Sequence, residues 1–435
     1  RSKLLAFMQT QRLANELKDW KEFYFAYNCD FRGRIYCATA GFSPQGTDNT
    51  RGLLQFAEKV QLGEEGLFWL GVHGANVFGN DKCTLDQRVE WAHSMKDVIE
   101  DIVLDPVGNI HLWESADKPY QFLAFCFDWD NCDYGRNKDA YSKLPVGMDG
   151  SCNGLQHFSA MLLDHVGAKA TNLCNTEFPQ DIYQEVADRC MERLSKIDSA
   201  YARRWTKVGV TRKCSKKPVM TLPYGATQQS CKVYIMEYVL DNWSKFGLPE
   251  RYQWEMTRYL VSLLWASIGD VVVSARVAMQ WLKDGVGHDL CKWKTPVGFP
   301  VFQSYKNVES IRVATQICGV VTLFFSDFNK PGEPNKYLQK SGISPNFIHS
   351  LDATHLVMTT LDTDIPSYAM VHDDYGTHAG NIPQLNAALR RQFVRLYTEF
   401  SPLEDWAKQI GYDAELPEKG YLDLQDVVNS QYFFS

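Results

Sequence analysis

The sequence predicts a helix-rich fold of the α/β (α+β) class, in which short strands lie among long helices. Several long segments repeat apolar residues at the spacing of one helix face, whereas the strand-like runs are short and end in Gly or Asp. The composition is that of a globular chain, because 45% of the 435 residues are hydrophobic and 22% are charged. These values exclude a disordered tail, a fibrous repeat and a low-complexity scaffold.

Charge and hydropathy narrow the function classes further. No window of about 18 residues is uninterrupted and apolar, so a transmembrane helix is excluded and we expect no membrane contact. The most apolar stretch, residues 260–282, contains Asp270 and Arg276. Because the net charge is −7, binding to nucleic acid would require a local basic groove and not a positive surface overall.

The 12 cysteines lie between Cys29 and Cys318, and none forms the Cys-x-x-Cys pair of a zinc site. A chain of this length builds a core without disulfide bonds, so we expect reduced thiols in a cytosol-like compartment. The first residue is Arg1, and apolar residues at helical spacing follow at once. We therefore expect the chain to be part of a longer protein.

The first half of the chain is mostly helical in pattern. Residues 1–20 have the spacing of an amphipathic helix and lead into the segment 23–35. Residues 42–52 are rich in Gly, Pro, Asn and Asp, which predicts a loop. Helical periodicity with weak breaks then extends over residues 53–102, and Asp105 followed by proline ends it.

A strand and two helices follow. Near Leu144 a short apolar run ends at Asp149, as a strand would. Residues 181–196 have apolar side chains at helical spacing, and residues 251–282 form a second long helical stretch, in two pieces near Gly269.

The beginning of the last third of the chain is predicted to be β-rich. Residues 297–323 alternate in the manner of strands, and residues 368–372 form a short strand that delivers Asp373 and Asp374 at its end. The sequence contains no internal repeat and no low-complexity linker. Carboxylates supplied from distant parts of the chain indicate one interwoven catalytic unit.

The first candidate site is the segment 148–157, Met-Asp-Gly-Ser-Cys-Asn-Gly-Leu-Gln-His. Asp149 at a strand end, followed by Gly150, can present its carboxylate and a nearby backbone carbonyl to a divalent ion. The alternative is that Asp149 caps the helix that follows.

The second candidate site is basic. Residues 199–236 contain eight Lys or Arg and no acidic residue. Arg212 and Lys216 are four residues apart, so on a helix they share a face and can bind one triphosphate together. Tyr224 lies two turns beyond Lys216, within reach of the sugar and base of that nucleotide. A solvated basic helix is the alternative, and the lack of acids weighs against it.

The third candidate site is the segment 370–376, Met-Val-His-Asp-Asp-Tyr-Gly. The repulsion between Asp373 and Asp374 is relieved either by a metal ion or by exposure in a surface turn. Together the three segments supply two metal-binding carboxylates, a phosphate clamp and a stacking ring, which are the parts of two-metal nucleotidyl transfer. One metal lowers the pKa of the attacking 3′-hydroxyl, and the second neutralises the leaving pyrophosphate.

Six segments in a fixed order carry a family resemblance. They are Asn-Cys-Asp-Phe-Arg-Gly-Arg-Ile-Tyr at residues 28–36, Asp-Gly-Ser-Cys-Asn-Gly-Leu-Gln-His from Asp149, Arg-x3-Lys-x7-Tyr-Gly from Arg212, Pro-Asn-Phe-Ile-His-Ser-Leu-Asp at residues 345–352, His-Asp-Asp from His372 and Tyr-Phe-Phe-Ser at residues 432–435. Over nearly its whole length the chain resembles the single-subunit, bacteriophage-type RNA polymerases of phages, mitochondria and plastids.

The resemblance implies a right-handed polymerase fold of palm and fingers, with a palm sheet that carries the catalytic aspartates. The implied regions are a thumb-helix tail at residues 1–20, the palm start at 21–59, a helical palm insertion at 60–139, palm with the first catalytic Asp at 140–165, fingers at 166–350 with a specificity-hairpin-like segment at 292–325, and palm with the second catalytic Asp and a C-terminal foot at 351–435.

The resemblance also implies the catalytic residues. Asp149 and Asp373 would be the ligands of two Mg²⁺ ions, with the carbonyl of Gly150 assisting. Lys216 would be catalytic as well, and it would bind the incoming triphosphate together with Arg212.

Tyr224 would close the nucleotide pocket, His349 would contact the ribose 2′-hydroxyl with it, and Gly225 would let the template backbone pass close. Related DNA polymerases place a bulky Glu five residues after the first metal Asp, where it blocks the 2′-hydroxyl, and here that position is Gly154. The pocket therefore has room for a ribose. Turn geometry is the alternative reason for Gly154, and a buried histidine bonded to backbone is the alternative for His349.

Further nucleic-acid and nucleotide contacts follow from the resemblance. Arg34 resembles the family's arginine near the template and hybrid, and Lys82 resembles its pyrophosphate-side lysine. Tyr183 resembles the fingers tyrosine linked to translocation. The segment around Arg312 resembles the hairpin that reads promoter bases in the major groove.

Two prolines depart from a straight helix carrying the basic site. Pro218 and Pro223 lack the amide donor that a helix interior needs. We therefore predict a kink or a helix restart between Arg212 and Gly225.

The resemblance implies a monomeric DNA-directed RNA polymerase. It would transfer ribonucleoside triphosphates to an RNA 3′-hydroxyl on a double-stranded DNA template with a promoter, in the cytoplasm of a phage-infected bacterium or, alternatively, in a mitochondrial matrix or plastid. One rival is a DNA polymerase or primase of the same superfamily, which Gly154 disfavours. The other is a catalytically silent nucleic-acid-binding fragment, which Asp149, Lys216 and Asp373 disfavour, because acids clustered without a metal are unfavourable.

Overall fold

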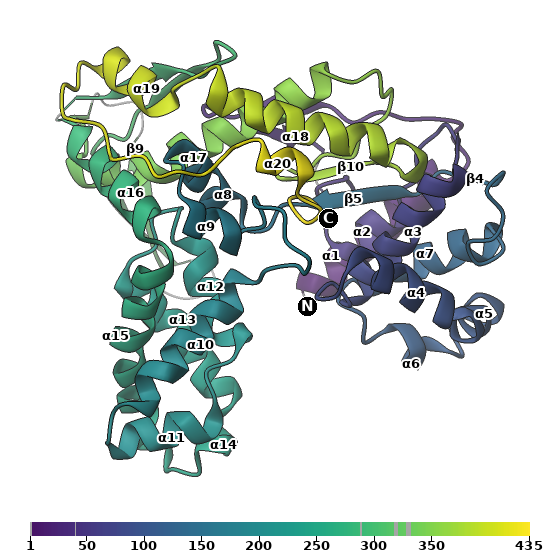
Figure 1. Ribbon diagram of the computed structural model, residues 1–435, viewed down its shortest axis with the longest axis horizontal. Helices are drawn as coiled ribbons and strands as arrows, with labels where there is room; N and C mark the ends of the chain where they lie inside the picture. Colours follow the sequence, from purple (N-terminus) through teal and green to yellow (C-terminus); the bar gives the residue numbers. More distant parts are fainter. Residues whose placement is uncertain (1, 40, 288, 317–320, 328–331) are drawn as a thin grey trace. The chain divides into compact units, whose positions relative to one another are not determined.

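The computed structural model describes residues 2–39, 41–287, 289–316, 321–327 and 332–435, and within them it contains many helices and five two-stranded sheets (Figure 1). The predicted helix-rich α/β class is confirmed. The chain divides into two compact units. Unit 1 consists of Arg1–Ile182, Asp352–Phe400 and Gly420–Ser435, and unit 2 of Tyr183–Leu351 and Ser401–Lys419.

The first part of unit 1 combines a hairpin with a layer of helices. Helix α1 (Ser2–Leu17) leads into the hairpin of β1 (Tyr27–Cys29) and β2 (Ile35–Cys37), and α2 (Asp48–Leu53) follows. A short antiparallel pair, β3 (Val60–Gln61) with β4 (Tyr141–Ser142), encloses the helical layer in sequence. The helices of this layer are α3 (Gly63–Phe78), α4 (Leu85–Ser94), α5 (Lys96–Leu104), α6 (Ile110–Trp113) and α7 (Pro119–Asn131).

Aromatic side chains of α7 form the centre of this layer. Phe122, Phe125 and Trp129 recur at spacings of three and four, so they share one face of the helix, and all three are fully buried. Consecutive rings are stacked, with centroids 5.9 and 5.5 Å apart. Gly74 of α3 makes room for the stack, because a Cβ at this position would lie 2.2 Å from the Phe125 ring.

An antiparallel strand pair lies on the same core. Strand β5 (Pro145–Asp149) pairs with β10 (Asp374–His378), and the register places Asp374 opposite Asp149. Met148 and Tyr375 point into the core, so the two aspartates lie on the other face of the pair. The neighbouring helices are α8 (Asn153–Met161), α9 (His165–Ala170), α18 (Ile382–Thr398) and α20 (Asp426–Asn429). Figure 1 shows α18 along this pair.

Unit 2 contains a helical bundle and two hairpins. The helices of the bundle are α10 (Ile182–Ser195), α11 (Ala200–Val208), α12 (Arg212–Thr221), α13 (Gln228–Asp241), α14 (Trp243–Phe246), η1 (Glu250–Tyr252), α15 (Gln253–Val271) and α16 (Val273–Gly285). The hairpins are β6 (Cys291–Lys294) with β7 (Pro300–Gln303), and β8 (Glu309–Thr315) with β9 (Val321–Asp327). Helix α19 (Pro402–Ile410) belongs to this unit, and α17 (Lys336–Leu361) contributes its residues up to Leu351.

Several predicted elements are confirmed in kind and place. Helices occupy the predicted stretches 1–20, 181–196 and 251–282, and strands occupy much of 297–323. The long stretch is broken at Val272, three residues after the predicted point at Gly269. The basic helix does not continue unbroken to Gly225, as predicted, because α12 ends at Thr221, before Pro223. Pro218, which was also expected to interrupt it, lies inside α12.

Three local predictions are wrong. The predicted loop at residues 42–52 contains the start of α2, whose tertiary contacts with α7 outweigh its poor helix-forming composition. Residues 54–62 are not helical and include β3. In the predicted strand 368–372 only Val371 forms a bridge, and the strand proper begins at Asp374, because pairing with β5 selects that segment.

Seven of the eleven described cysteines are buried. All eleven are free, and Cys29 is the one that is classed as exposed among those described. Burial raises the pKa of several of these thiols, for example that of Cys190 to about 12. Cys318 lies outside the described residues.

Among the described residues, no single helix is long and apolar enough to cross a membrane. The pair Glu250–Val271 and Val273–Gly285, bent by 96°, reaches the required length and composition only when its two helices are taken together.

Candidate active site

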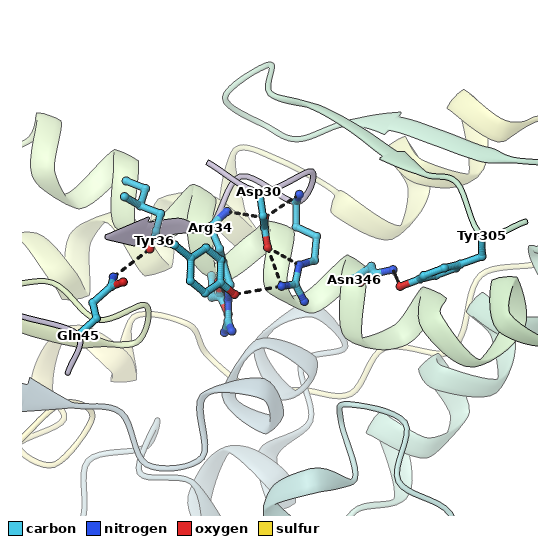
Figure 2. Close-up of polar contacts among 9 residues, drawn as sticks. Asp30, Arg34, Tyr36, Gln45, Tyr305 and Asn346 are labelled. Atoms are coloured by element: carbon cyan, nitrogen blue, oxygen red, sulfur yellow. Dashed lines mark hydrogen bonds and ion pairs between the residues drawn. The ribbon is translucent and has the colours of Figure 1, made fainter. Parts of the chain in front are cut away.

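The hairpin of β1 and β2 presents a basic turn that its own side chains hold. The carboxylate of Asp30 accepts hydrogen bonds from the backbone N–H groups of Arg32 at 2.9 Å and Arg34 at 3.1 Å, and from the Arg32 guanidinium at 2.6 Å. Figure 2 shows these contacts around Asp30. The Arg32 guanidinium also donates to the Tyr36 hydroxyl at 3.1 Å. The turn therefore positions Arg34 through its backbone.

Arg34 forms a buried ion pair with Asp352 of α17. Its Nε lies 3.0 and 3.1 Å from the two carboxylate oxygens, and Nη2 also contacts Oδ2. Burial raises the pKa of Asp352 to about 7, although the charge of Arg34 opposes the rise. Arg34 thus has an internal partner, and its contact with template and hybrid stays a prediction.

Asp149 ends β5 beside the last residues of the chain. The backbone N–H of Ser435 donates to the Asp149 carbonyl at 3.4 Å, and Gly150 forms a bridge with Phe434. The N-cap of the following helix α8 is Cys152, with a left-handed φ of 63°. The alternative in which Asp149 caps this helix is therefore wrong.

Asp373 lies in a tight turn with His372. Backbone hydrogen bonds of 2.8 and 2.9 Å between Val371 and Asp374 close this turn. His372 has a φ of 56°, a conformation that residues other than glycine rarely adopt. Its ring packs edge-on against that of Tyr36, with centroids 4.6 Å apart. The β1–β2 hairpin thus supports the turn that carries Asp373.

Gln45 links the same hairpin to the segment before this turn. Its Oε1 accepts from the Cys37 N–H at 2.8 Å, and its Nε2 donates to the carbonyls of Ile35 at 3.0 Å and Met370 at 3.4 Å. Figure 2 shows Gln45 bonded to the backbone of β2. The amide group therefore holds Met370 at a set distance from β2.

The acidic residues at this site influence one another. The Asp149 side chain keeps contact with solvent, yet surrounding protein atoms remove much of its water. This desolvation, followed by the negative charges of Asp374 and Asp373, raises the pKa of Asp149 to about 8, and the positive charge of Lys118 opposes the rise. Desolvation also raises the pKa of Asp373.

Asp374 differs from its neighbour because it has a cationic partner. The Nη2 of Arg51 lies 2.8 Å from Asp374 Oδ2, and both side chains are largely shielded from solvent. Among the described residues, Asp373 has no ion-pair partner within 4.0 Å. The ion pair thus distinguishes Asp374 from Asp373, and binding of a cation by Asp149 and Asp373 stays a prediction.

The donor set fits the predicted magnesium ions. Mg²⁺ at phosphate-transfer sites is held by one or two carboxylates together with water and substrate phosphates, and not by a complete protein cage. Within the described part of the chain, no group of three or more His, Cys, Asp or Glu residues forms such a cage. A bound cation would offset both the desolvation and the neighbouring negative charges that raise the pKa of Asp149.

In unit 2, the basic residues of helix α12 fall into two groups: those paired with acids of α13 and those that are not. Lys217 forms an ion pair with Glu237, and Lys213 lies 3.6 Å from Asp241, both acids being on α13. Lys216 is exposed and has no ion-pair partner within 4.0 Å among the described residues. The Arg212 guanidinium lies over the Tyr183 ring, 5.1 Å from its centroid. The predicted nucleotide-binding pair thus lies apart from the lysines that join α12 to α13.

Tyr224 and His349, predicted to act together, are in contact. Their rings are stacked, with centroids 4.8 Å apart and planes 30° apart, and both side chains are partly exposed. Gly225 has a φ of 87°, and a Cβ there would lie 3.1 Å from the Ser341 carbonyl oxygen. Packing within the chain therefore gives Gly225 a structural reason, and its role beside a template stays a prediction.

Two other predicted residues are on exposed segments. Lys82 pairs with Asp81 at 2.8 Å, in a loop that the buried Arg88 holds through the Asp81 carbonyl at 2.9 Å. Arg88 also lies 3.5 Å from the hydroxyl of Ser435, which ties this loop to the end of the chain beside Asp149. Arg312 is exposed on β8, opposite Phe324 of β9. The roles of Lys82 and Arg312 stay predictions.

Comparison with known sequences decides the family. The profile of the family described as DNA-dependent RNA polymerase matches residues 60–413, a range that includes Asp149, Lys216 and Asp373. The chain belongs to the DNA-dependent RNA polymerase family. The predicted family resemblance is therefore confirmed.

Relatives within this polymerase family come from phages and from mitochondria. The DNA-directed RNA polymerase of Enterobacteria phage K11 is 33% identical over 99% of this chain and 53% of its own length. T7 RNA polymerase of Escherichia phage T7 is 34% identical, with 99% and 55% covered. The mitochondrial DNA-directed RNA polymerase of Mus musculus is 35% identical, with 97% and 37% covered. The chain spans about half the length of the phage relatives that it matches.

Sequence reasoning missed several residues around this polymerase-family site. Arg51, Gln45 and Lys118 lie in segments without a recognisable motif. Arg51 and Gln45 contact residues 323 and 325 positions away, and Lys118 acts on Asp149 through its charge. In the sequence, Arg51 appears only as a basic residue three positions after Asp48 in a Gly-rich segment. That pattern does not indicate which acid it would pair with.

Proposed function

We propose that this chain is the catalytic part of a DNA-directed RNA polymerase, which adds ribonucleotides to an RNA 3′-hydroxyl under the direction of a DNA template and releases pyrophosphate. The observation that carries the proposal is the pairing of β5 with β10, which brings Asp149 to the same strand pair as the turn of Asp373 in a chain of this family. The substrates would be ribonucleoside triphosphates, the growing RNA and double-stranded DNA with a promoter.

The two compact units would correspond to the parts of a right-handed polymerase. Unit 1 would be the palm with the catalytic aspartates, and unit 2 would be the fingers. Residues 1–20 would be the tail of a thumb helix, 60–139 a palm insertion, 292–325 a promoter-reading hairpin, and the end of the chain a C-terminal foot.

Asp149 and Asp373 would hold two Mg²⁺ ions, with the carbonyl of Gly150 assisting. When bound, the ions would lower the pKa of the attacking hydroxyl and neutralise the charge that develops on the pyrophosphate. The chain itself would orient these ligands: the Val371–Asp374 turn sets the position of Asp373, and the contacts of Gly150 and Ser435 set that of Asp149.

Arg212 and Lys216 would bind the triphosphate of the incoming nucleotide. The stacking of Arg212 on Tyr183 would hold its guanidinium in place, and Lys216 would provide a positive charge that no acid of the described chain neutralises. Lys82 would meet the pyrophosphate side, while Arg34, Tyr183, Gly225 and Arg312 would contact the nucleic acid.

Sugar selection would depend on three residues. The stacked pair of Tyr224 and His349 offers a hydroxyl and an imidazole to the 2′-hydroxyl. Gly154, buried in the first turn of α8, leaves the position five residues after Asp149 without a bulky side chain. A DNA polymerase or primase is the second candidate, and Gly154 is the observation that disfavours it.

The polymerase would act as a monomer in a compartment that the relatives leave open. Named relatives include phage, mitochondrial and chloroplastic enzymes, so the cytoplasm of an infected bacterium, a mitochondrial matrix and a plastid all agree with the family.

The test is extension of an RNA primer annealed to a DNA template, with Mg²⁺ and either rNTPs or dNTPs. We expect template-matched addition of rNTPs by the wild type and none by Asp373→Asn. Preferential addition of dNTPs would favour the DNA polymerase instead. Equal extension by wild type and variant would overturn the metal-ligand assignment.

A further inference from the structure

We propose that Arg51 is a positioning residue that holds a third carboxylate, that of Asp374, away from the metal-binding pair Asp149 and Asp373. The inference rests on the proposed polymerase function and adds a residue that specifies which acids serve the reaction. The observation that supports it is the ion pair between Arg51 Nη2 and Asp374 Oδ2 at 2.8 Å. The Arg51 side chain is 24% exposed and the Asp374 side chain 17%.

The register of the strand pair makes such a residue necessary. Asp374 lies directly opposite Asp149, and opposite residues of an antiparallel pair project from the same face. Two of the three acids at the site thus lie side by side on one face, and the third follows in the adjacent turn. Without a partner, Asp374 would compete with Asp149 and Asp373 for a divalent cation.

The carboxylate of Asp374 is directed away from its opposite residue. A Cβ built on Gly147 would lie 2.5 Å from Asp374 Oδ1, so this oxygen lies over the strand two residues before Asp149. Only a glycine at position 147 leaves that space. Gly147 and Arg51 therefore act on the same side chain, one by leaving room and the other by supplying charge.

Helix α2 holds Arg51 in place. The carboxylate of Asp48, in the first turn of α2, accepts from the N–H groups of Tyr120 at 2.8 Å and Gln121 at 3.3 Å at the start of α7. At the other end of α2, a Cβ on Gly52 would lie 2.6 Å from the Tyr120 carbonyl oxygen. The short helix is thus in close contact with α7 on both sides of Arg51. These contacts fix the backbone from which the guanidinium extends.

Loss of the arginine leaves a negative charge that is largely shielded from water and adjacent to the metal ligands. Breaking a shielded ion pair by removal of one partner is costly, whereas removal of both partners is tolerated much better. The expected defect therefore lies in metal binding and in the rate at saturating nucleotide, with little change in the KM for rNTPs, because Arg51 has no assigned contact with the nucleotide.

The test is a double-mutant cycle with Arg51→Met and Asp374→Asn, read by primer extension over a range of Mg²⁺ concentrations. We expect Arg51→Met to lower the maximal rate by about tenfold and to shift the Mg²⁺ optimum. Asp374→Asn in the same chain should restore the rate to within about threefold of the wild type. A control variant, Arg391→Met, removes the guanidinium of another ion pair of unit 1, with Asp362, and should change neither quantity.

A second variant approaches the same side chain without touching the arginine. Gly147→Ala should displace the Asp374 carboxylate and reproduce the defect of Arg51→Met, and Asp374→Ala should relieve it by removing the clash. If Arg51→Met stays equally impaired with Asp374→Asn, Arg51 acts on something other than this carboxylate and the proposal is wrong.

Mn²⁺ binding separates the polymerase proposal from the positioning proposal. It is measured by electron paramagnetic resonance on the wild type, Arg51→Met, Asp374→Asn and the double variant. If the wild type binds Mn²⁺ but adds no nucleotide, the polymerase proposal has failed in this assay. The positioning proposal is then judged by the Mn²⁺ affinity alone, which Arg51→Met should change and Asp374→Asn should return to the wild-type value. An affinity unchanged by Arg51→Met would overturn it.

Discussion

Two adjacent aspartates, Asp373 and Asp374, have different surroundings, and the different roles proposed for them rest on this difference. Asp374 starts a strand and pairs with Arg51, whereas Asp373 lies in the turn before it with no such partner among the described residues. The family motif singles out Asp373, but the sequence does not show what occupies Asp374, whose partner Arg51 lies 323 positions away.

Replacement of Asp373 by Asn should abolish nucleotide addition while the template is still bound. A metal ligand contributes several kcal/mol to the reaction, so we expect the rate of extension to fall by about a thousandfold or more. Quenched-flow primer extension measures the rate, and fluorescence anisotropy measures template binding. Asp364→Asn, at an exposed aspartate of the same segment, is the matched control. Near-normal extension by Asp373→Asn would remove this residue from the metal site.

Replacement of Tyr224 by Phe should weaken the selection against dNTPs with little loss of speed. The ring still stacks on His349, but the hydroxyl that would recognise the ribose is lost, and one such hydrogen bond accounts for roughly a tenfold preference. Competition between rNTPs and dNTPs on one template measures this preference. Tyr234→Phe, on α13, serves as control. Unchanged sugar selection would exclude the Tyr224 hydroxyl from this function.

Buried histidines should make the fold sensitive to acid. Burial lowers the pKa of His355 to about 4, below the usual value of 6.5, so the unfolded chain binds a proton that the folded chain refuses. The stability that neutral His355 provides is complete above pH 6.5 and decreases as the pH falls towards 4. Between pH 6.5 and 5 the loss is at most about 2 kcal/mol.

Urea unfolding of the wild type and of His355→Gln at a series of pH values measures this contribution. Carboxylates with a raised pKa, such as Asp352, act in the opposite direction, because they take up protons on folding. The difference between the two proteins isolates the histidine. We expect the stability gap to narrow as the pH falls from 6.5 to 5, and a constant gap would contradict the prediction.

At the level of elements, the close contact of α3 with α7 in unit 1 depends on glycines of α3. These glycines differ in how closely side chains of α7 approach them. A Cβ at Gly74 would enter the Phe125 ring, which is fully buried between two other rings and has no room to move. A Cβ at Gly71, one turn earlier on α3, would meet its nearest atom at an ordinary 3.4 Å.

Gly74→Ala should therefore destabilise the protein by about 1–3 kcal/mol, the usual cost of overpacking a core. Gly71→Ala, which has the same helix-propensity gain without the clash, should be neutral or slightly stabilising. Thermal unfolding of both variants decides the matter. Equal stability of the two variants would mean that α3 and α7 separate at low cost.

Elements whose apolar residues share one face could be predicted from the sequence, and those selected by pairing could not. The spacing of Ile182, Val186 and Cys190 predicts α10 because all three lie in the core. Strand β10, by contrast, contains Asp374 and Gly376, which disfavour strands, and it forms because β5 offers a partner. Helix α2 was likewise predicted to be a loop, because it forms through its contacts with α7 and not through its own composition.

The candidate site divides in the same way. Asp149, Lys216, Tyr224 and Asp373 belong to short motifs, so they could be named from the sequence, and the stacking of Tyr224 on His349 agrees with their expected joint action. The supporting contacts of Gln45 and Arg51 join segments more than three hundred residues apart. No local period encodes such a distance, which is why the structure was needed to find them.

At the scale of the whole molecule, an acidic chain that binds DNA must do so through a small basic surface. The net charge is −7, and Lys213 and Lys217 of the acid-free segment are already close to acids of α13. Affinity for a DNA template should fall steeply with salt, with a logarithmic slope of about −0.9 for each phosphate contacted.

Arg312→Gln should reduce the magnitude of this slope by about one phosphate contact if the β8–β9 hairpin meets DNA. Lys138→Gln, at a lysine that pairs with Glu64 on the surface of unit 1, should leave the slope unchanged. Filter binding of a DNA duplex between low and moderate KCl measures both slopes. Identical slopes for wild type and Arg312→Gln would exclude a phosphate contact by Arg312.

The distribution of thiols gives the protein a built-in attachment point for a fluorophore. Cys29 is exposed at the end of β1, next to Asp30, while burial keeps thiols such as Cys190 protonated and hidden from maleimides. Among the described cysteines, a dye coupled at low reagent excess should therefore prefer the hairpin that supports the turn of Asp373. Its emission would report on the surroundings of that hairpin during the proposed nucleotide addition, without any engineered cysteine.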